Sequence, residues 1–305
     1  MFMETIILGH CILNVNSRAP GIARWRNVVK PVWDIVKSKQ AGFLQLPCPE
    51  AVYLGLRRWW FVKEQYDNSL FRELCRRIAV GMSEILEENN IGKFKLIGLG
   101  ISPSCGYRET QSDPSWGGRP REVDVKSNLK PEPGVFIEIL DETFRKYGFD
   151  YEIYDLPPLV IYPEERTGSR MYPRDFESCI RELCVFLEYD YRQLHLNEYG
   201  ELVYSDSRWG RILVAPIEAA IKNRSLIEKY VEEGYGLILI PSSEILTAEK
   251  EIIVDVYVKQ IENHLDVGHE ILLMMYEPSS NLYKKTLEFL KENGLVERIT
   301  VVTYV

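Results

Sequence analysis

The sequence predicts an α/β protein built from two Rossmann-like, doubly wound units with mainly parallel sheets. The first observation is that short apolar runs alternate with amphipathic segments of helical length, as in βαβ units. The second is composition. Of the 305 residues, 46% are hydrophobic and 27% are charged, which indicates a globular chain long enough for two cores.

Four strands are predicted in the first half. The apolar runs occupy residues 5–10, 43–47, 94–99 and 151–161, and Pro157-Pro158 interrupts the last. Helical spacing predicts helices over 22–39, with a kink or late start at Pro31, over 69–88, with Ser69 as N-cap, and over 134–147. The polar segment 107–133 is expected to lie over the strand ends as a lid.

The second half alternates more regularly. Strands are predicted over 212–215, 237–240, 271–275 and 299–304, with helices over 218–232, 248–265 and 281–292. A charged, turn-rich segment at 163–173 is the predicted boundary, which gives domains of residues 1–162 and 163–305. A helix over 175–188 and a hairpin near 199–200 are expected between the boundary and the regular part. No glycine-rich dinucleotide fingerprint or phosphate-loop motif is present, so neither NAD nor ATP binding is indicated.

Charge and hydropathy narrow the class of partner. A net charge of -8 and a pI near 5.3 argue against a protein that coats nucleic acid or a membrane surface. No apolar segment reaches the ~18 residues that cross a bilayer, and the chain begins without a basic leader. We therefore expect a cytoplasmic protein that binds a small molecule and neither a membrane nor nucleic acid.

Three of the six cysteines follow predicted strands directly. Cys11, Cys48 and Cys105 come at or just after the ends of the first three apolar runs, whereas the other three fall in helical patterns typical of core residues (Cys75, Cys179 and Cys184). Carboxyl ends of neighbouring parallel strands open into one crevice, so the first three thiols are expected to converge. The residues alone leave three interpretations open: an iron–sulfur cluster with a vacant fourth iron, zinc bound by three thiolates, or unrelated buried cysteines.

The motifs around these cysteines add a family resemblance. Leu46-Pro47-Cys48-Pro49-Glu50 and Gly100 to Gly106, with Cys11 ahead of them and the segments 53–59 and 64–67 between them, resemble the thiouracil desulfidases and related putative desulfidases. The resemblance covers about residues 1–150. It implies a [4Fe–4S] cluster held by Cys11, Cys48 and Cys105, whose fourth iron takes the sulfur of a thiocarbonyl substrate. It also implies that Glu50 and Ser102 are the active-site glutamate and serine.

On this basis we expect a hydrolytic, non-redox desulfidase that converts C=S to C=O in a thio-nucleobase or thioamide. Glu50 would be the acid/base, and Ser102 would hydrogen-bond the substrate or the attacking water. Weaker candidates for substrate contacts are Ser104, Arg58, Trp59 and Tyr66.

Both residues also have a purely structural interpretation. Glu50 would be a carboxylate that stabilises the start of a helix, and Ser102 would be a serine that forms a turn. Two other functions remain open. One is a reductive enzyme similar to the dehydratases that use a three-cysteine cluster, and the other is a sensor that binds a metal or small molecule without turnover.

Overall fold

The computed structural model describes residues 4–39, 41–59, 61–115, 128–162, 169–194, 196–199 and 210–304. It is an α/β protein with two four-stranded sheets in which all strands run parallel, as predicted. Among the described helices, none offers an apolar stretch long enough to span a bilayer.

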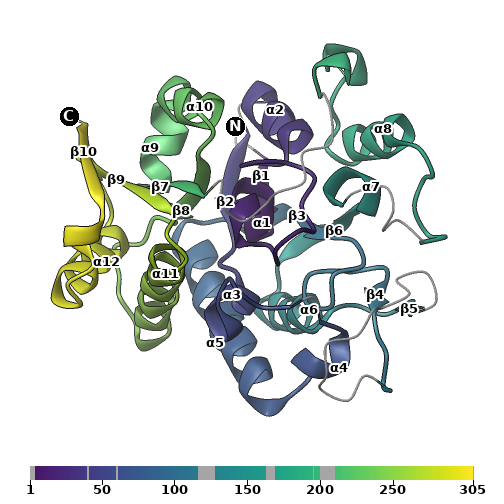
Figure 1. The fold of residues 1–305 in the computed structure, drawn as a ribbon, viewed down its shortest axis with the longest axis horizontal. Coiled ribbons are helices and arrows are strands. Elements are labelled where there is room, and N and C mark those ends of the chain that lie inside the picture. Colours follow the sequence, from purple (N-terminus) through teal and green to yellow (C-terminus); the bar gives the residue numbers. More distant parts are fainter. Residues whose placement is uncertain are drawn as a thin grey trace.

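The first sheet has the strand order β2-β1-β3-β6, and it carries the three strands that end near cysteines as direct neighbours. Its strands are β1 (Thr5–Leu8), β2 (Gly42–Gln45), β3 (Lys93–Leu99) and β6 (Asp150–Leu156). Helices α2 (Lys30–Lys39) and α8 (Phe176–Phe186) cover one face, and α5 (Ser69–Glu88) and α6 (Val135–Tyr147) cover the other (Figure 1). The chain runs from β1 to β2 on one side and then crosses back to β3 on the other side of β1, so a crevice forms between β1 and β3, where the strand order reverses.

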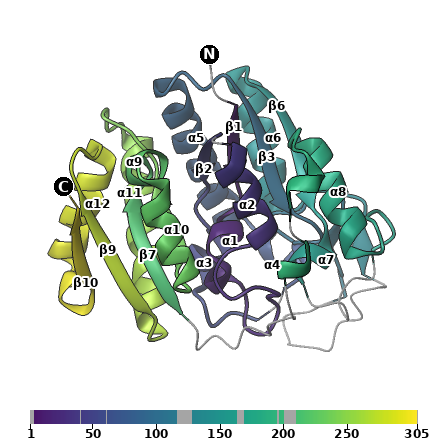
Figure 2. The ribbon, with the colours of Figure 1, turned by 90° about the horizontal axis from the view of Figure 1, so that it is seen from above.

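The second sheet has the order β10-β9-β7-β8. Its strands are β7 (Arg211–Pro216), β8 (Gly236–Ile240), β9 (Glu270–Tyr276) and β10 (Thr300–Tyr304). Helices α9 (Ile217–Lys222) and α10 (Arg224–Glu232) lie on one face, and α11 (Ala248–Asp266) and α12 (Asn281–Glu292) on the other (Figure 1). The two sheets stand side by side, with residues 210–304 against the β2 side of the first sheet (Figure 2).

Gln45 joins the two sheets at their facing edges, β2 and β8. Its buried side-chain amide accepts the Leu239 N–H at 2.8 Å and donates to the Leu237 carbonyl at 2.8 Å, as a neighbouring peptide group would. Arg224 of α10 donates to the carbonyls of Val36 and Lys37 at the end of α2. The Gln45 bonds give partners to backbone groups at the edge of β8, and the Arg224 bonds give partners to carbonyls in the last turn of α2.

Short elements line the carboxyl edge of the first sheet. They are α1 (His10–Leu13), η1 (Val15–Ser17), α3 (Pro49–Leu54), α4 (Lys63–Tyr66), the β4–β5 ladder (Thr110–Gln111 with Leu129–Lys130) and α7 (Pro158–Ile161). Further 3-10 turns occur at η3 (Tyr191–Gln193), η4 (Leu196–Tyr199) and η6 (Val296–Arg298). The ladder occupies part of the predicted lid, whose residues 116–127 lie outside the described residues.

Proline accounts for two differences from the predicted elements. The helix predicted over 22–39 begins at Lys30. Pro31 therefore lies in the first turn, where backbone N–H groups have no intrahelical acceptor, so the N–H that proline lacks costs no hydrogen bond. The strand predicted over 151–161 ends at Leu156, and Pro158 starts α7 instead.

Two helix termini also differ from the prediction. Asn68, and not Ser69, caps α5, since its side chain accepts the Phe71 N–H at 3.0 Å. The helix predicted over 218–232 is two helices, α9 and α10, separated at Asn223. The hairpin predicted near 199–200 falls partly outside the described residues, with Tyr199 ending a 3-10 turn.

Candidate active site

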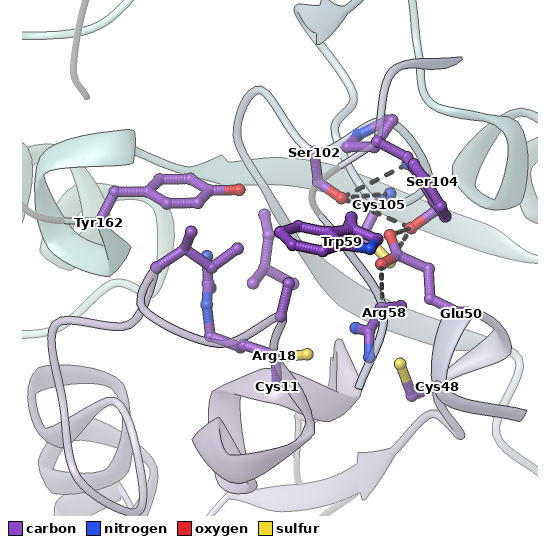
Figure 3. A pocket seen from close by; sticks show the side chains of 15 residues that line it. Cys11, Arg18, Cys48, Glu50, Arg58, Trp59, Ser102, Ser104, Cys105 and Tyr162 are labelled. Atoms are coloured by element: carbon purple, nitrogen blue, oxygen red, sulfur yellow. Dashed lines mark hydrogen bonds and ion pairs between the residues drawn. The ribbon is translucent and has the colours of Figure 1, made fainter. Parts of the chain in front are cut away.

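The carboxyl ends of β1, β2 and β3 bring three thiols to one cavity. Cys11 lies in α1, Cys48 caps α3, and Cys105 lies in the turn after β3. All three line a cavity of about 40 Å³, around which Figure 3 shows them. The other lining residues are Arg18, Ala19, Ile22, Glu50, Arg58, Trp59, Phe61, Leu99, Ser102, Pro103, Ser104 and Tyr162.

Cys11 and Cys48 are immediate neighbours. Both contact the small apolar cluster of Ala51 and Leu56 beside the cavity. The Cys48 sulfur accepts the Ala51 N–H at 3.4 Å as the N-cap of α3, and Pro49 occupies the first turn. A hydrogen bond with the Cys11 thiol, followed by burial, raises the pKa of Cys48. A pair of thiols in this position binds metal only as it loses protons.

The turn that carries Cys105 is fixed from several sides. Its carbonyl accepts the Leu99 N–H at 2.9 Å, and its own N–H donates to Ser102 Oγ at 3.1 Å. The Ser104 carbonyl accepts N–H groups from the first turn of α6 at 2.9 and 3.1 Å. Gly98 is required beneath the turn, because a Cβ there would lie 2.5 Å from the Cys105 carbonyl oxygen. Burial, and then the charge of Glu50, raises the pKa of the Cys105 thiol.

Asp155 of β6 holds the chain that follows Cys105. Its fully buried carboxylate accepts the backbone N–H groups of Tyr107 and Arg108 at 2.6–2.8 Å and the Tyr172 hydroxyl at 2.7 Å. Burial raises the pKa of Asp155 to about 6, although these hydrogen bonds act to lower it. The fourth strand therefore anchors the third cysteine.

Glu50, in the first turn of α3, is held by three donors. Its Oε2 accepts Arg58 Nε and the Tyr66 hydroxyl, each at 3.0 Å, and its Oε1 accepts the Ser104 hydroxyl. A carboxylate oxygen has two acceptor positions, so those of Oε2 are filled and Oε1 keeps one beside the cavity. The Glu50 side chain is 15% exposed, which places that position within reach of a small ligand.

The Arg58 guanidinium donates hydrogen bonds to other groups of the protein. Besides Glu50 it donates to the carbonyls of Ser17 at 2.8 Å and Gly55 at 3.2 Å, with its side chain only 2% exposed. Burial is the largest influence and opposes its charge, but Glu50, followed by Cys48, Tyr66 and Cys11, raises the pKa of Arg58. Its position makes it the counter-ion of Glu50 more than a contact for substrate.

The remaining sequence candidates take different places. Ser102 and Ser104 both line the cavity. The Ser104 hydroxyl donates to Glu50, whereas the Ser102 hydroxyl accepts the N–H groups of Ser104 and Cys105 and so stabilises the turn. Trp59 lines the cavity with 66% of its surface exposed, at the mouth. Tyr66 is 1% exposed and does not line the cavity, because its ring packs against Phe61 and Phe71 while its hydroxyl holds Glu50.

Sequence reasoning missed Arg18 and Tyr162. Arg18 comes seven residues after Cys11 in a polar loop, and Tyr162 follows α7. The guanidinium carbon of Arg18 lies 4.4 Å from the centroid of the Tyr162 ring, and both side chains line the cavity. The only signal in the sequence was the closeness of Arg18 to Cys11 along the chain.

The second half of the chain also reaches this site. Gln260 of α11 accepts the Cys48 N–H at 3.2 Å and donates to His10 Nε2 at 3.0 Å, while Asn263 donates to the Ala51 carbonyl at 2.8 Å. Burial lowers the pKa of His10 to about 3, so this ring is neutral, with Nδ1 donating to the Leu46 carbonyl. Residues of α11 thus fix the segment that carries Cys48 and Glu50.

Among the residues that the structure describes, no three His, Cys, Asp or Glu side chains lie close enough together to hold a single metal ion. The cysteines outside the cavity, Cys75 in α5 and Cys179 and Cys184 in α8, are buried in the core. This agrees with their predicted role as apolar filling.

Comparison with known proteins yields one informative similarity. The chain is 38% identical over 98 residues to an uncharacterised protein of Methanocaldococcus jannaschii. The matched region is 32% of this chain and 63% of that protein, so the chain spans less than two thirds of the length of the curated relative it matches. Neither a family model nor a solved structure matches the chain.

Proposed function

We propose that this chain binds a [4Fe–4S] cluster through Cys11, Cys48 and Cys105 and hydrolyses the C=S bond of a small thiolated molecule, such as a thio-nucleobase or thioamide. The observation that carries the proposal is the convergence of three thiols on one cavity, which a Glu50–Ser104 pair also lines. The reaction exchanges sulfur for oxygen: water adds to the carbon, the C–S bond breaks, and sulfur leaves as hydrosulfide without electron transfer.

The donor set fits such a cluster. Thiolates are the ligands that iron–sulfur clusters take, and each cysteine binds a different iron, so the sulfurs must surround a group larger than one ion. Three strand ends supply three sulfurs around one cavity, and a three-cysteine set leaves one iron without a protein ligand. When bound, the cluster supplies a soft Lewis-acidic iron for the sulfur of the substrate.

Glu50 is the base that this site offers to water. The open acceptor position on its Oε1 can take a proton from a water molecule as that water attacks the thiocarbonyl carbon. The Ser104 hydroxyl already donates to the same oxygen, so it steadies the carboxylate and can pass a proton between Glu50 and the substrate. The proton that Glu50 accepts then returns to the departing sulfur.

Arg58 and Tyr66 are positioning residues for this base. Their bonds to Oε2 fix the direction in which Oε1 points, and Arg58 supplies the counter-charge of the carboxylate in a mostly buried setting. Trp59 at the mouth offers an apolar surface over which a planar substrate can stack.

Anaerobic reconstitution with iron and sulfide tests the cluster. We expect close to four irons per chain in the wild type, taken from the stoichiometry of the cluster, and reduced iron in Cys11→Ser, Cys48→Ser and Cys105→Ser. Cys75→Ser is the matched control, because it is buried outside the cavity and should retain iron. Full iron in the three cavity variants would refute the ligand assignment.

Sulfide release from 2-thiouracil without a reductant tests the reaction. We expect the wild type to release sulfide and Glu50→Gln to lose about 10²–10⁴-fold in rate while it keeps its iron. Release only with a reductant would indicate a reductive cluster enzyme instead. A cluster without turnover under either condition, across a panel of thioamides, would favour a sensor.

A further inference from the structure

Arg18 is a buried cation with unfilled hydrogen-bonding capacity. It is 7% exposed, yet its Nε and Nη1 have no hydrogen-bond acceptor among the described residues. Nε carries one N–H and Nη1 carries two, so several donors of a charged group lie out of water without partners. Such donors are costly to bury and point to an acceptor that binds there.

The neighbours of Arg18 supply no counter-charge. It forms no ion pair with any carboxylate in the described part of the chain, and its guanidinium lies over the Tyr162 ring. Burial raises the pKa of Tyr162 even though the charge and hydrogen bond of Arg18 act to lower it, so this phenol is neutral. Glu50, the one carboxylate among the described residues that line the cavity, is already paired with Arg58. In the described part of the chain, no carboxylate of the cavity lining is therefore left to pair with Arg18.

We propose that Arg18 binds a negatively charged oxygen of the substrate, a carboxylate or a phosphate, so that the natural substrate is a small thiolated anion. A guanidinium in a buried site suits this role because its donors match planar oxyanions and it never loses its charge. The inference deepens the proposed function and rests on it for the C=S group, but binding of the anion requires no turnover.

The arrangement separates the two ends of such a substrate. Tyr162, which carries the Arg18 guanidinium, lies across the cavity from Glu50 in Figure 3. Arg18 directly follows η1, whereas Glu50 and Ser104 lie in the segments that follow β2 and β3. An anionic group held at Arg18 would thus stand away from the Glu50 carboxylate, which avoids repulsion between like charges and leaves Glu50 facing the reacting carbon.

Oxygen analogues test this by binding alone. Calorimetric titration of the anaerobically reconstituted protein compares orotate, which is uracil with a carboxylate, against uracil itself. We expect orotate to bind about tenfold or more tightly in the wild type, since a charge-assisted hydrogen bond contributes that much. The preference should fall to near onefold in Arg18→Gln and persist in part in Arg18→Lys, which keeps the charge.

Arg76→Gln is the matched control, because it removes the same charge from an exposed position on α5. It should leave the preference for orotate unchanged. Inorganic phosphate serves as competitor: displacement of orotate assigns the site to oxyanions in general, and its failure assigns it to planar carboxylates.

Two results would overturn the inference: no preference for orotate in the wild type, or the same preference in Arg18→Gln. If the first result came with loss of iron in Arg18→Gln, Arg18 would serve the cluster and not the substrate. These failures differ from failure of the proposed function, which appears as absent sulfide release while Arg18-dependent orotate binding remains.

Discussion

The Glu50–Arg58 pair permits a sharp test of how the proposed catalytic carboxylate is held. In Arg58→Met, Glu50 would lose the one cation paired with it among the described residues and would keep two hydroxyl donors. The carbonyls of Ser17 and Gly55 would each lose the hydrogen bond that Arg58 donates. Removal of one partner from a buried ion pair costs about 3–5 kcal/mol, because the remaining charge stays buried. We therefore expect Arg58→Met to lower the free energy of unfolding by about that amount.

Glu50→Gln and the double variant complete a thermodynamic cycle. Each single change leaves one buried polar group without its partner, whereas the double variant removes both charges. The loss of unfolding free energy in the double variant should therefore be smaller than the sum of the losses in the two single variants. We expect a coupling of at least about 2 kcal/mol. Urea unfolding of the cluster-free protein at pH 7 measures it, followed by tryptophan fluorescence.

The control cycle uses Arg181 and Glu177, the same residue types 2.6 Å apart on the surface of α8, with side chains 56% and 55% exposed. Such a pair should couple by only about 0.5 kcal/mol. Additive effects of the Glu50 and Arg58 changes would refute the reasoning, because Arg58 would then not be what stabilises the charge of Glu50.

Three further outcomes follow from contacts around the cysteines. Gln260→Leu removes the acceptor of the Cys48 N–H and should loosen the segment that carries Cys48. Cys48 in the cluster-free protein should then react several-fold faster with iodoacetamide. An unchanged rate would mean that α11 does not hold this segment. Gly98→Ala places a Cβ 2.5 Å from the Cys105 carbonyl oxygen and should cost about 1–3 kcal/mol in thermal or urea unfolding and lower the iron content; normal values for both would contradict the packing argument.

The third prediction concerns how the free energy of unfolding depends on pH. Burial raises the pKa of Asp155 to about 6, so between about pH 4 and 6 the folded protein binds a proton that the unfolded chain has released. The contribution of Asp155 to stability is therefore complete at the acid end and falls as pH rises, by about 3 kcal/mol in all. Asp155→Asn should lose this slope in urea unfolding from pH 4 to 7, and a slope equal to that of the wild type would assign it to other groups.

The sequence determined the fold class and the edge of the sheet at which the site lies. Apolar periodicity and the breaks after each run are local, and parallel strands place their carboxyl ends together, so the common position of Cys11, Cys48 and Cys105 followed from their places along the chain. Helix boundaries were predicted less accurately, as the late start at Lys30 shows, because they depend on capping and proline placement as well as on apolar spacing.

Only the tertiary structure decided what surrounds those cysteines. The pairing of Arg58 with Glu50, the reach of Gln260 to Cys48 and the unfilled donors of Arg18 over Tyr162 all join side chains from separate elements. No local pattern encodes such contacts, because they depend on how two sheets pack edge to edge and on which buried donors then find acceptors. The sequence thus located the thiols, and packing decided which charges and hydrogen bonds surround them.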